Sequence, residues 1–220
     1  MYYDLHVRSL ENIEETVKLA KSLGWNGLGI IMPWKSYKEF DLEKLKANNM
    51  DMVIGAEIDA KKVSEMRRIV GSMRRRAELL VVNSNDLDMS RAALELPEVD
   101  ILVSPAYDMN HVLARLAAKN NVSLCFDFRD LLHSHKKARA GVVSRITEAA
   151  RIIRKYRAPF IISSGAQSPW DLRPTQELTA FGKVLGFQEN QILNALSGKI
   201  IKENRKRLSG KWVMPGVEIE

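Results

Sequence analysis

The sequence predicts one TIM-barrel-like α/β domain with seven parallel strands and outer helices. Seven short apolar runs rich in Val, Ile and Leu alternate with amphipathic helical patterns, which is typical of parallel strands joined by crossover helices. Most of the runs are continuously apolar, as expected of strands covered on both faces, and this favours a closed barrel over an open doubly wound sheet. The predicted strands are Tyr2–Val7, Gly27–Met32, Met52–Ile58, Glu78–Val82, Val99–Val103, Val122–Phe128 and Phe160–Ser163.

The helices are predicted from apolar stripes and from their end signals. Asn12 followed by Glu15 indicates a variant capping box at the start of the first helix, and Gly24 closes that helix. The sequence from Pro174 onward is helical in pattern, so seven strands fit better than the regular eight. We expect a barrel domain over residues 1–208 and a tail over 209–220. The later helices are expected at Lys61–Arg75, Asp86–Leu96, His111–Lys119, Ala140–Tyr156, Pro174–Leu185, Gln188–Ser197 and Lys199–Leu208.

Composition indicates a cytoplasmic protein. The N-terminus lacks the basic and apolar regions of a secretion signal, and no run of about 18 uncharged apolar residues would span a membrane. The single cysteine, Cys125, lies in an apolar run and has no partner for an internal disulfide, which points to a reducing compartment. We therefore expect no contact with membranes.

Positive charge is concentrated in the second half of the chain. The net charge is +7, but residues 1–110 hold 15 Lys and Arg against 18 Asp and Glu (−3), whereas residues 111–220 hold 19 against 9 (+10). Such an asymmetry is typical of a surface that faces a polyanion, although a merely solvated basic face is the simpler alternative.

The predicted strand ends hold polar residues but no complete catalytic set. Asp4 and His6 stand one residue apart on the first strand, and Glu57 ends the third, so the three could begin a metal site. The pattern is similar to that of the polymerase-and-histidinol-phosphatase family, whose site needs several histidines; this chain has 4, and Asp4 stands where the first would be. A metal-dependent phosphoesterase is thus kept as the alternative function. No Gly-x-Ser-x-Gly turn and no P-loop are present.

Four segments between residues 84 and 173 carry a more specific pattern. They are Ser84-Asn85-Asp86, His111-Val112-Leu113-Ala114, the stretch from Asn121-Val122 to Asp130-Leu131-Leu132, and Ser163-Ser164-Gly165-Ala166 with Trp170-Asp171-Leu172-Arg173. Together they resemble the barrel subunit of ribonuclease P, the protein component 3 family, from about Leu79 to Leu185.

The resemblance implies a distorted barrel of the phosphoesterase type without the metal ligands. It implies a holoenzyme subunit that is not catalytic alone and binds no cofactor, while the RNA subunit removes the 5′ leader of precursor tRNA with bound magnesium. The implied partners are that RNA, a small ferredoxin-like protein subunit joined in a heterotetramer, and precursor tRNA indirectly. A scaffold that binds only proteins remains a third possibility.

Basic residues in and near these segments are the predicted RNA contacts. The set comprises Arg91, His111, Lys119, Lys155 and Arg173, together with Arg129, Lys136 and Arg139 in a long loop after the sixth strand that also holds His133, His135 and Lys137. Arg173 is the strongest candidate, because the guanidinium fork suits phosphate. Helix capping by His111 and dipole interactions of Lys119 and Lys155 are the structural alternatives. Trp170 could stack on a base, but its place beside Pro169 favours a packing role.

Overall fold

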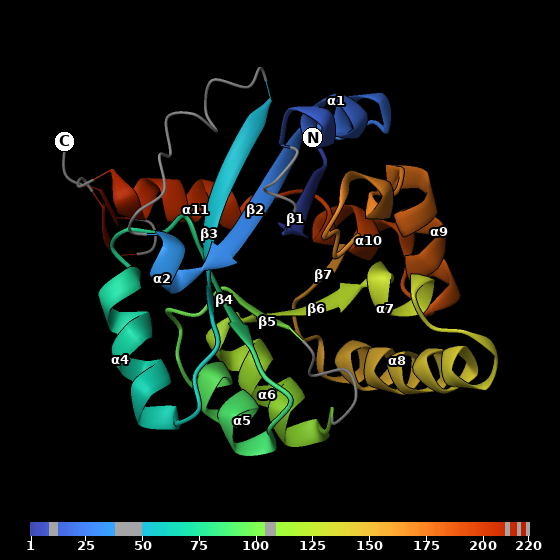
Figure 1. The fold of residues 1–220 in the computed structure, drawn as a ribbon. Coiled ribbons are helices and arrows are strands. Elements are labelled where there is room, and N and C mark those ends of the chain that lie inside the picture. Colours follow the sequence, from blue (N-terminus) through green and yellow to red (C-terminus); the bar gives the residue numbers. More distant parts are fainter. Residues whose placement is uncertain (9–12, 38–49, 104–108, 210–211, 215–216, 219–220) are drawn as a thin grey trace.

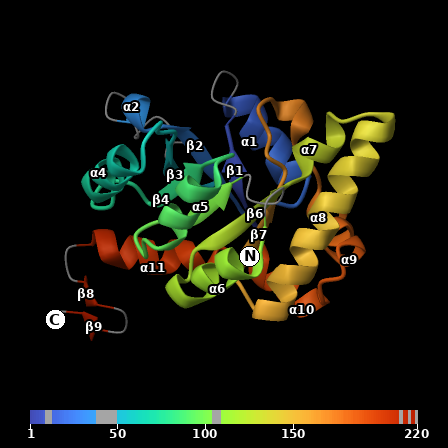
Figure 2. The same ribbon diagram turned by 90° about the horizontal axis from the view of Figure 1, so that it is seen from below.

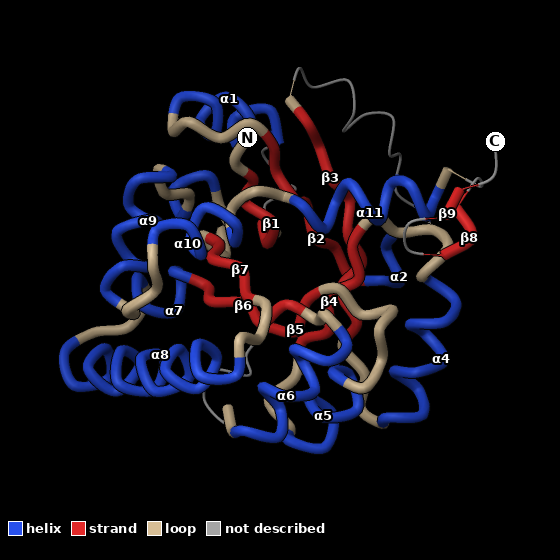
Figure 3. Tube along the Cα trace, turned by 180° about the vertical axis from the view of Figure 1, so that it is seen from behind, coloured by secondary structure: helices blue, strands red, loops and turns tan. Residues whose placement is uncertain are grey.

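The computed structural model describes residues 1–8, 13–37, 50–103, 109–209, 212–214 and 217–218. Its centre is a sheet of seven parallel strands whose spatial order is their order in the chain (Figures 1 and 3). The predicted barrel-like architecture and its seven strands are thereby confirmed. The strands are β1 (Tyr3–Val7), β2 (Gly27–Pro33), β3 (Asp51–Ile58), β4 (Leu79–Asn83), β5 (Ile101–Val103), β6 (Ser123–Asp127) and β7 (Phe160–Ser163).

The barrel is nearly closed, because β1 returns beside β7 without a strand ladder between them. The free edge of β1 is instead satisfied at both ends by segments that follow β7. The amide of Tyr3 donates to the carbonyl of Leu196 at 2.8 Å, and the amide of Arg8 donates to that of Ala166 at 2.7 Å. Edge backbone groups therefore find partners without an eighth strand.

Helices cover the outside of the sheet (Figures 1 and 2). They are α1 (Ile13–Ser22), α2 (Trp34–Tyr37), α4 (Val63–Met73), α5 (Leu87–Leu94), α6 (His111–Asn120), α7 (Phe128–Leu132), α8 (Lys136–Tyr156), α9 (Thr175–Val184), α10 (Glu189–Ala195) and α11 (Lys199–Leu208), with a 3-10 helix η2 (Pro169–Asp171). The predicted Asn12 cap lies outside the described residues. Among those described, no helix combines the length and apolar character needed to span a bilayer.

The loop expected after the sixth strand is largely helical, which corrects the sequence prediction. Helix α7 follows β6 directly, and α8 begins at Lys136, four residues before the predicted Ala140. The basic composition of this stretch masked its helical pattern. Of its predicted RNA contacts, Arg129 lies on α7, and Lys136 and Arg139 lie on the first turn of α8.

Two apolar layers form the core. The inner layer fills the barrel with side chains from the inner face of the sheet, such as Leu5, Val81 and Ile101, and the outer layer lies between the sheet and the helices. Helix α11 closes the N-terminal end of the barrel, since Ile201 joins the inner layer and Arg205 binds Asp51 at 2.7 Å. Beyond α11, the tail contains a small antiparallel pair, β8 (Trp212–Met214) and β9 (Val217–Glu218).

Candidate nucleic-acid interface

A bulge in β1 separates the first two candidate metal ligands. The pairing register with β2 shifts between Asp4 and Val7, and Val7 joins the outer core layer although Tyr3 and Leu5 join the inner one. The strict alternation expected of Asp4 and His6 is thus interrupted. The two side chains reach different partners.

Asp4 is fully buried against the end of β7. It accepts hydrogen bonds from the hydroxyl of Ser163 and from the amide of Ser164, the latter at 3.2 Å. Burial raises the pKa of Asp4 above its usual value, and the charge of Asp127 adds to this, while the hydrogen bonds from Ser163 and Ser164 oppose it. Asp4 therefore joins β1 to β7 across the unpaired edge.

His6 binds the carboxylate at the end of β6. Its Nδ1 lies 2.8 Å from Asp127 Oδ2, and the thiol of Cys125 donates to Asp127 Oδ1 at 3.2 Å. Burial by itself would raise the pKa of Asp127, but the charge and hydrogen bond of His6 outweigh it and hold that pKa below its usual value. Burial and the nearby carboxylates raise the pKa of the Cys125 thiol well above its usual value.

Glu57, the third residue of the alternative metal site, belongs to a separate ion pair. Both guanidinium arms of Arg8 bind its carboxylate, Nε at 3.1 Å, and Asn83 Nδ2 donates to it at 3.1 Å. Within the described part of the chain, the donors close enough to share an ion are those of His6, Cys125 and Asp127. Arg8 and Asn83 hold Glu57 outside this group, and the group offers one histidine where the phosphatase type uses several, so the donor set does not fit a hydrolytic metal centre of that type.

Cationic side chains from α7 meet the 3-10 helix η2 beside the barrel mouth. Asp171 of η2 accepts from His133 Nε2 at 2.8 Å and lies 3.5 Å from Arg129 Nε. The same carboxylate accepts from the amides of Gln167 and Ser168. Although burial opposes them, these hydrogen bonds and the two cations lower the pKa of Asp171.

Arg173 and Trp170 extend this cluster. Arg173 Nη1 donates to the carbonyls of Trp170 at 3.0 Å and Leu172 at 2.7 Å, so part of the donor capacity of the predicted strongest contact is used within the chain. The expected packing role of Trp170 is wrong, because its side chain is 74% exposed.

A second cationic site lies between α6 and α8, which run side by side (Figure 2). Its cavity of about 350 Å³ is lined by Met109, Asn110, His111, Glu148, Arg151, Ile152, Lys155 and Tyr156. The structure thus brings together His111 and Lys155, which lie 44 residues apart in the chain. The side chain of Asn110 caps α6 by accepting from the amides of Val112 and Leu113, so His111 is not the cap.

Aromatic and acidic neighbours order this α6–α8 groove. The guanidinium of Arg115 and the ammonium of Lys155 lie 5.1 and 5.6 Å from the ring centroid of Tyr156. Arg151 Nη2 is 2.7 Å from Glu148, but their side chains are 71% and 56% exposed. Since exposed pairs of this kind contribute little, Arg151 remains available to an anion.

The other predicted contacts are exposed but separate. Arg91 lies on α5 and pairs with Glu95 at 3.3 Å, and Lys119 lies in the last turn of α6. Arg139 donates from Nε to the carbonyl of Ser134 at 2.8 Å, and Lys136 opens α8. The sequence analysis missed Arg151, although its spacing of four residues from Lys155 places both on one helical face.

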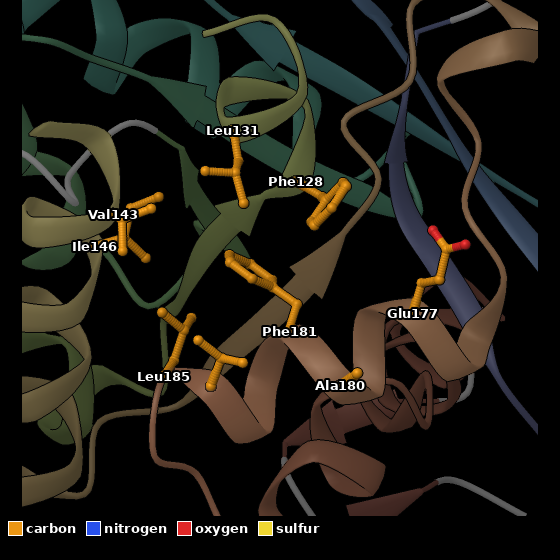
Figure 4. A pocket seen from close by; sticks show the side chains of 9 residues that line it. Phe128, Leu131, Val143, Ile146, Glu177, Ala180, Phe181 and Leu185 are labelled. Atoms are coloured by element: carbon orange, nitrogen blue, oxygen red, sulfur yellow. The ribbon is translucent and has the colours of Figure 1, made fainter. Parts of the chain in front are cut away.

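An apolar groove lies between α7, α8 and α9 on the same side of the barrel. Its cavity of about 400 Å³ is lined by Phe128, Leu131, Val143, Ile146, Glu177, Ala180, Phe181, Val184 and Leu185. In Figure 4 the ring of Phe181 points toward the α7 and α8 side chains, while Glu177 lies at the far end. Val184 is 73% exposed at its edge.

Comparisons with known proteins decide which family this geometry serves. The sequence profile described as RNase P subunit p30 matches residues 1–209. The chain belongs to the RNase P subunit p30 family. Ribonuclease P protein component 3 of Methanosarcina mazei is 32% identical over 99% of this chain and 95% of its own length. The corresponding Methanosarcina barkeri protein is 32% identical over 93% of this chain and 90% of its own.

Solved structures agree with this family. A chain of the cryo-EM structure of archaeal ribonuclease P with mature tRNA matches with a TM-score of 0.85 and 25% identity, over 97% of this chain and 96% of that one. Histidinol phosphate phosphatase of Lactococcus lactis matches with a TM-score of 0.56 and 11% identity, over 84% and 92%, which shows the fold alone. As a p30 family member, the chain is a protein subunit of ribonuclease P, the endoribonuclease that processes the 5′ end of tRNA, and the phosphoesterase alternative is not favoured.

Proposed function

We propose that this p30 family subunit binds the ribonuclease P RNA through phosphates, by shape more than by base sequence, from two cationic sites on one scaffold. The observation that carries the proposal is the α6–α8 groove, where His111, Arg151 and Lys155 line one cavity on the basic half of the chain. A surface groove lined by Lys and Arg side chains is typical of the electrostatic footprint of nucleic-acid binding. Arg129 and Arg173 beside η2 form the second site.

Phosphodiester hydrolysis in this proposal belongs to the RNA subunit and its magnesium. At the strand ends, Arg8 pairs with Glu57 and His6 Nδ1 pairs with Asp127. The chain itself binds no cofactor and orients the RNA. The free, buried thiol of Cys125 is consistent with a protein that functions in the reducing cytoplasm.

The small ferredoxin-like subunit is the proposed protein partner, and it binds in the apolar groove between α7, α8 and α9. An amphipathic helix would place an apolar stripe on Phe181 and Val184. Basic side chains at the start of α8, Lys136, Lys137 and Arg139, favour acidic flanks on that helix. Two copies of each protein would form the heterotetramer, and precursor tRNA would be contacted indirectly.

Reconstitution of precursor-tRNA cleavage tests the function. Omitting this chain from the assembled holoenzyme should lower activity, whereas the chain alone, with Mn²⁺ or Zn²⁺ added, should cleave no phosphodiester. Turnover by the chain alone would support the phosphoesterase alternative. A scaffold that binds only proteins would show no salt-dependent binding of the isolated RNA subunit, contrary to the proposal.

Val184→Asp separates the apolar groove from the RNA sites. The added charge at the edge of the apolar groove should weaken binding of the ferredoxin-like subunit and leave direct binding of the RNA unchanged. Leu193→Asp, at another partly exposed apolar side chain on α10, is the matched control. Equal loss in both variants would remove the groove from the proposal.

A further inference from the structure

Trp170 is a large apolar side chain that the fold leaves uncovered. It stands in η2, between β7 and α9, with its side chain 74% exposed, whereas its neighbours Pro169 and Asp171 are buried. A tryptophan contributes to the core only when its ring is covered, so packing does not account for this one. The indole is presented to something outside the chain.

The backbone beneath the indole is fixed from several sides. Asp171 accepts from the amides of Gln167 and Ser168 at 3.1 and 3.3 Å, and the amide of Leu172 donates to the carbonyl of Pro169. The carbonyl of Trp170 itself accepts from Arg173 Nη1 at 3.0 Å.

The helix also has a link to the core of the barrel wall. The indole nitrogen of buried Trp25 donates to the carbonyl of Arg173 at 2.9 Å. Trp170 therefore lies on a rigid turn, and the backbone of this turn loses little conformational entropy when a ligand binds.

Charged side chains that contact η2 and the residues after it select the chemistry of the ligand. Arg129 and His133 both approach Asp171, whose carboxylate is shared between them and two backbone amides. Arg173 follows at three residues and lies 3.8 Å from Glu177. An exposed aromatic side chain on a turn that three basic side chains contact, with the buried Asp171 and the exposed Glu177 as their carboxylate partners, suits a planar group attached to an anion.

We propose that Trp170 stacks on an unpaired nucleobase whose flanking phosphates lie against Arg129 and Arg173. This inference rests on the proposed RNA-binding function and adds a base contact to it. The base must be unpaired and unstacked, because in a duplex both faces of each base are already covered. The RNA subunit and the precursor tRNA are the two possible sources of that base.

The test compares Trp170→Phe, Trp170→Leu and Trp170→Ala with the wild-type chain. Loss of one base stack should weaken RNA binding by about 5- to 150-fold in the Leu and Ala variants, and the Phe variant should keep most of the affinity. The slope of log affinity against log salt should stay at the wild-type value, because no phosphate contact is removed. Leu193→Ala is the control for loss of an exposed apolar side chain.

Two arms distinguish the sources of the base. The first measures the affinity of the purified chain for the RNA subunit, and the second measures the affinity of the reconstituted holoenzyme for precursor tRNA. Weakening in the first arm places the base in the RNA subunit, and weakening in the second arm alone places it in the substrate.

Three outcomes overturn the inference while the proposed function stands. They are wild-type affinity of Trp170→Ala in both arms, equal retention of affinity by Leu and Phe, and an effect confined to binding of the protein partner. Failure of the wild-type chain to bind RNA in a salt-dependent way would instead overturn the proposed function itself.

Discussion

The salt dependence of RNA binding by the α6–α8 groove is the sharpest prediction of this structure. We expect Arg151→Gln and Lys155→Gln each to remove one phosphate contact, and so to reduce the slope of log affinity against log salt by about 0.7 to 0.9. At 0.1 M salt this corresponds to about 5- to 8-fold weaker binding per variant and about 25- to 60-fold for the double variant. The difference should vanish as salt approaches 1 M, where counterion release no longer favours binding.

The assay is filter binding of the RNA subunit across a salt series, with Lys183→Gln as the control. Lys183 is exposed on α9 and pairs with Glu189 at 3.4 Å, as Arg151 pairs with Glu148, but it lies outside the groove. Affinity losses that are equal at every salt concentration would mean that the variants disturb packing and not phosphate contacts. An unchanged slope in the double variant would refute the assignment of the groove.

Three further predictions concern stability. Arg74→Met should lower the free energy of unfolding in urea by about 3 to 5 kcal/mol, because it leaves buried Asp100, 2.7 Å from Arg74 Nη1, without its counter-ion; a loss below 1 kcal/mol would contradict this. The pKa of Asp127 is lowered by folding, so its contribution to the free energy of unfolding is present above the pKa of the unfolded chain and is lost as pH falls through the pKa of the folded chain. Asp127→Asn should therefore flatten the acid limb of a curve of stability against pH below about pH 4. An unaltered limb would argue against the pairing with His6. The hydroxyl of Tyr3 donates to Asp51 at 2.7 Å, and burial together with this bond raises the pKa of Tyr3 to about 12. Its contribution to the free energy of unfolding is therefore kept up to about pH 10 and lost toward pH 12. Tyr3→Phe should remove this alkaline loss of stability, and a titration followed at 295 nm should show one fewer tyrosine that ionises late.

The strands were predictable because burial on both faces leaves a continuous apolar run, and each of the seven runs lies within about two residues of its strand. The segment after β6 was not, since α7 has only five residues, too few to show a helical period, and the start of α8 is basic. The hydrogen bond of His133 to Asp171 joins residues 38 apart, and periodicity within one element cannot reveal such a pair. The role of Trp170 was misjudged for the same reason. A neighbouring proline indicates a turn, but it does not show whether other parts of the chain cover the indole.

The candidate site was predictable in its parts but not in its assembly. Charge asymmetry located the basic half, and sequence position located His111 and Lys155, but only the packing of α6 against α8 places them in one cavity. The metal alternative failed for two reasons that hydrophobic patterning does not register: Arg8 pairs with Glu57, and a bulge in β1 interrupts the alternation of Asp4 and His6. A one-residue insertion changes which side chains face each other across a sheet.

The polar groups at the strand ends explain how a barrel of this fold can bind RNA without a hydrolytic site of its own. A hydrolytic metal site needs several donors that converge on one ion and leave a position open for water or substrate. Here Asp4 is bonded to Ser163, Glu57 is bonded to Arg8, and Asp127 is shared between its neighbours, so the strand ends stabilise the barrel across its unpaired edge. A wall held in this way does not need to move during function. The outer helices and η2 can then present cations at fixed spacing, which is what a protein must supply to an RNA that performs the cleavage itself.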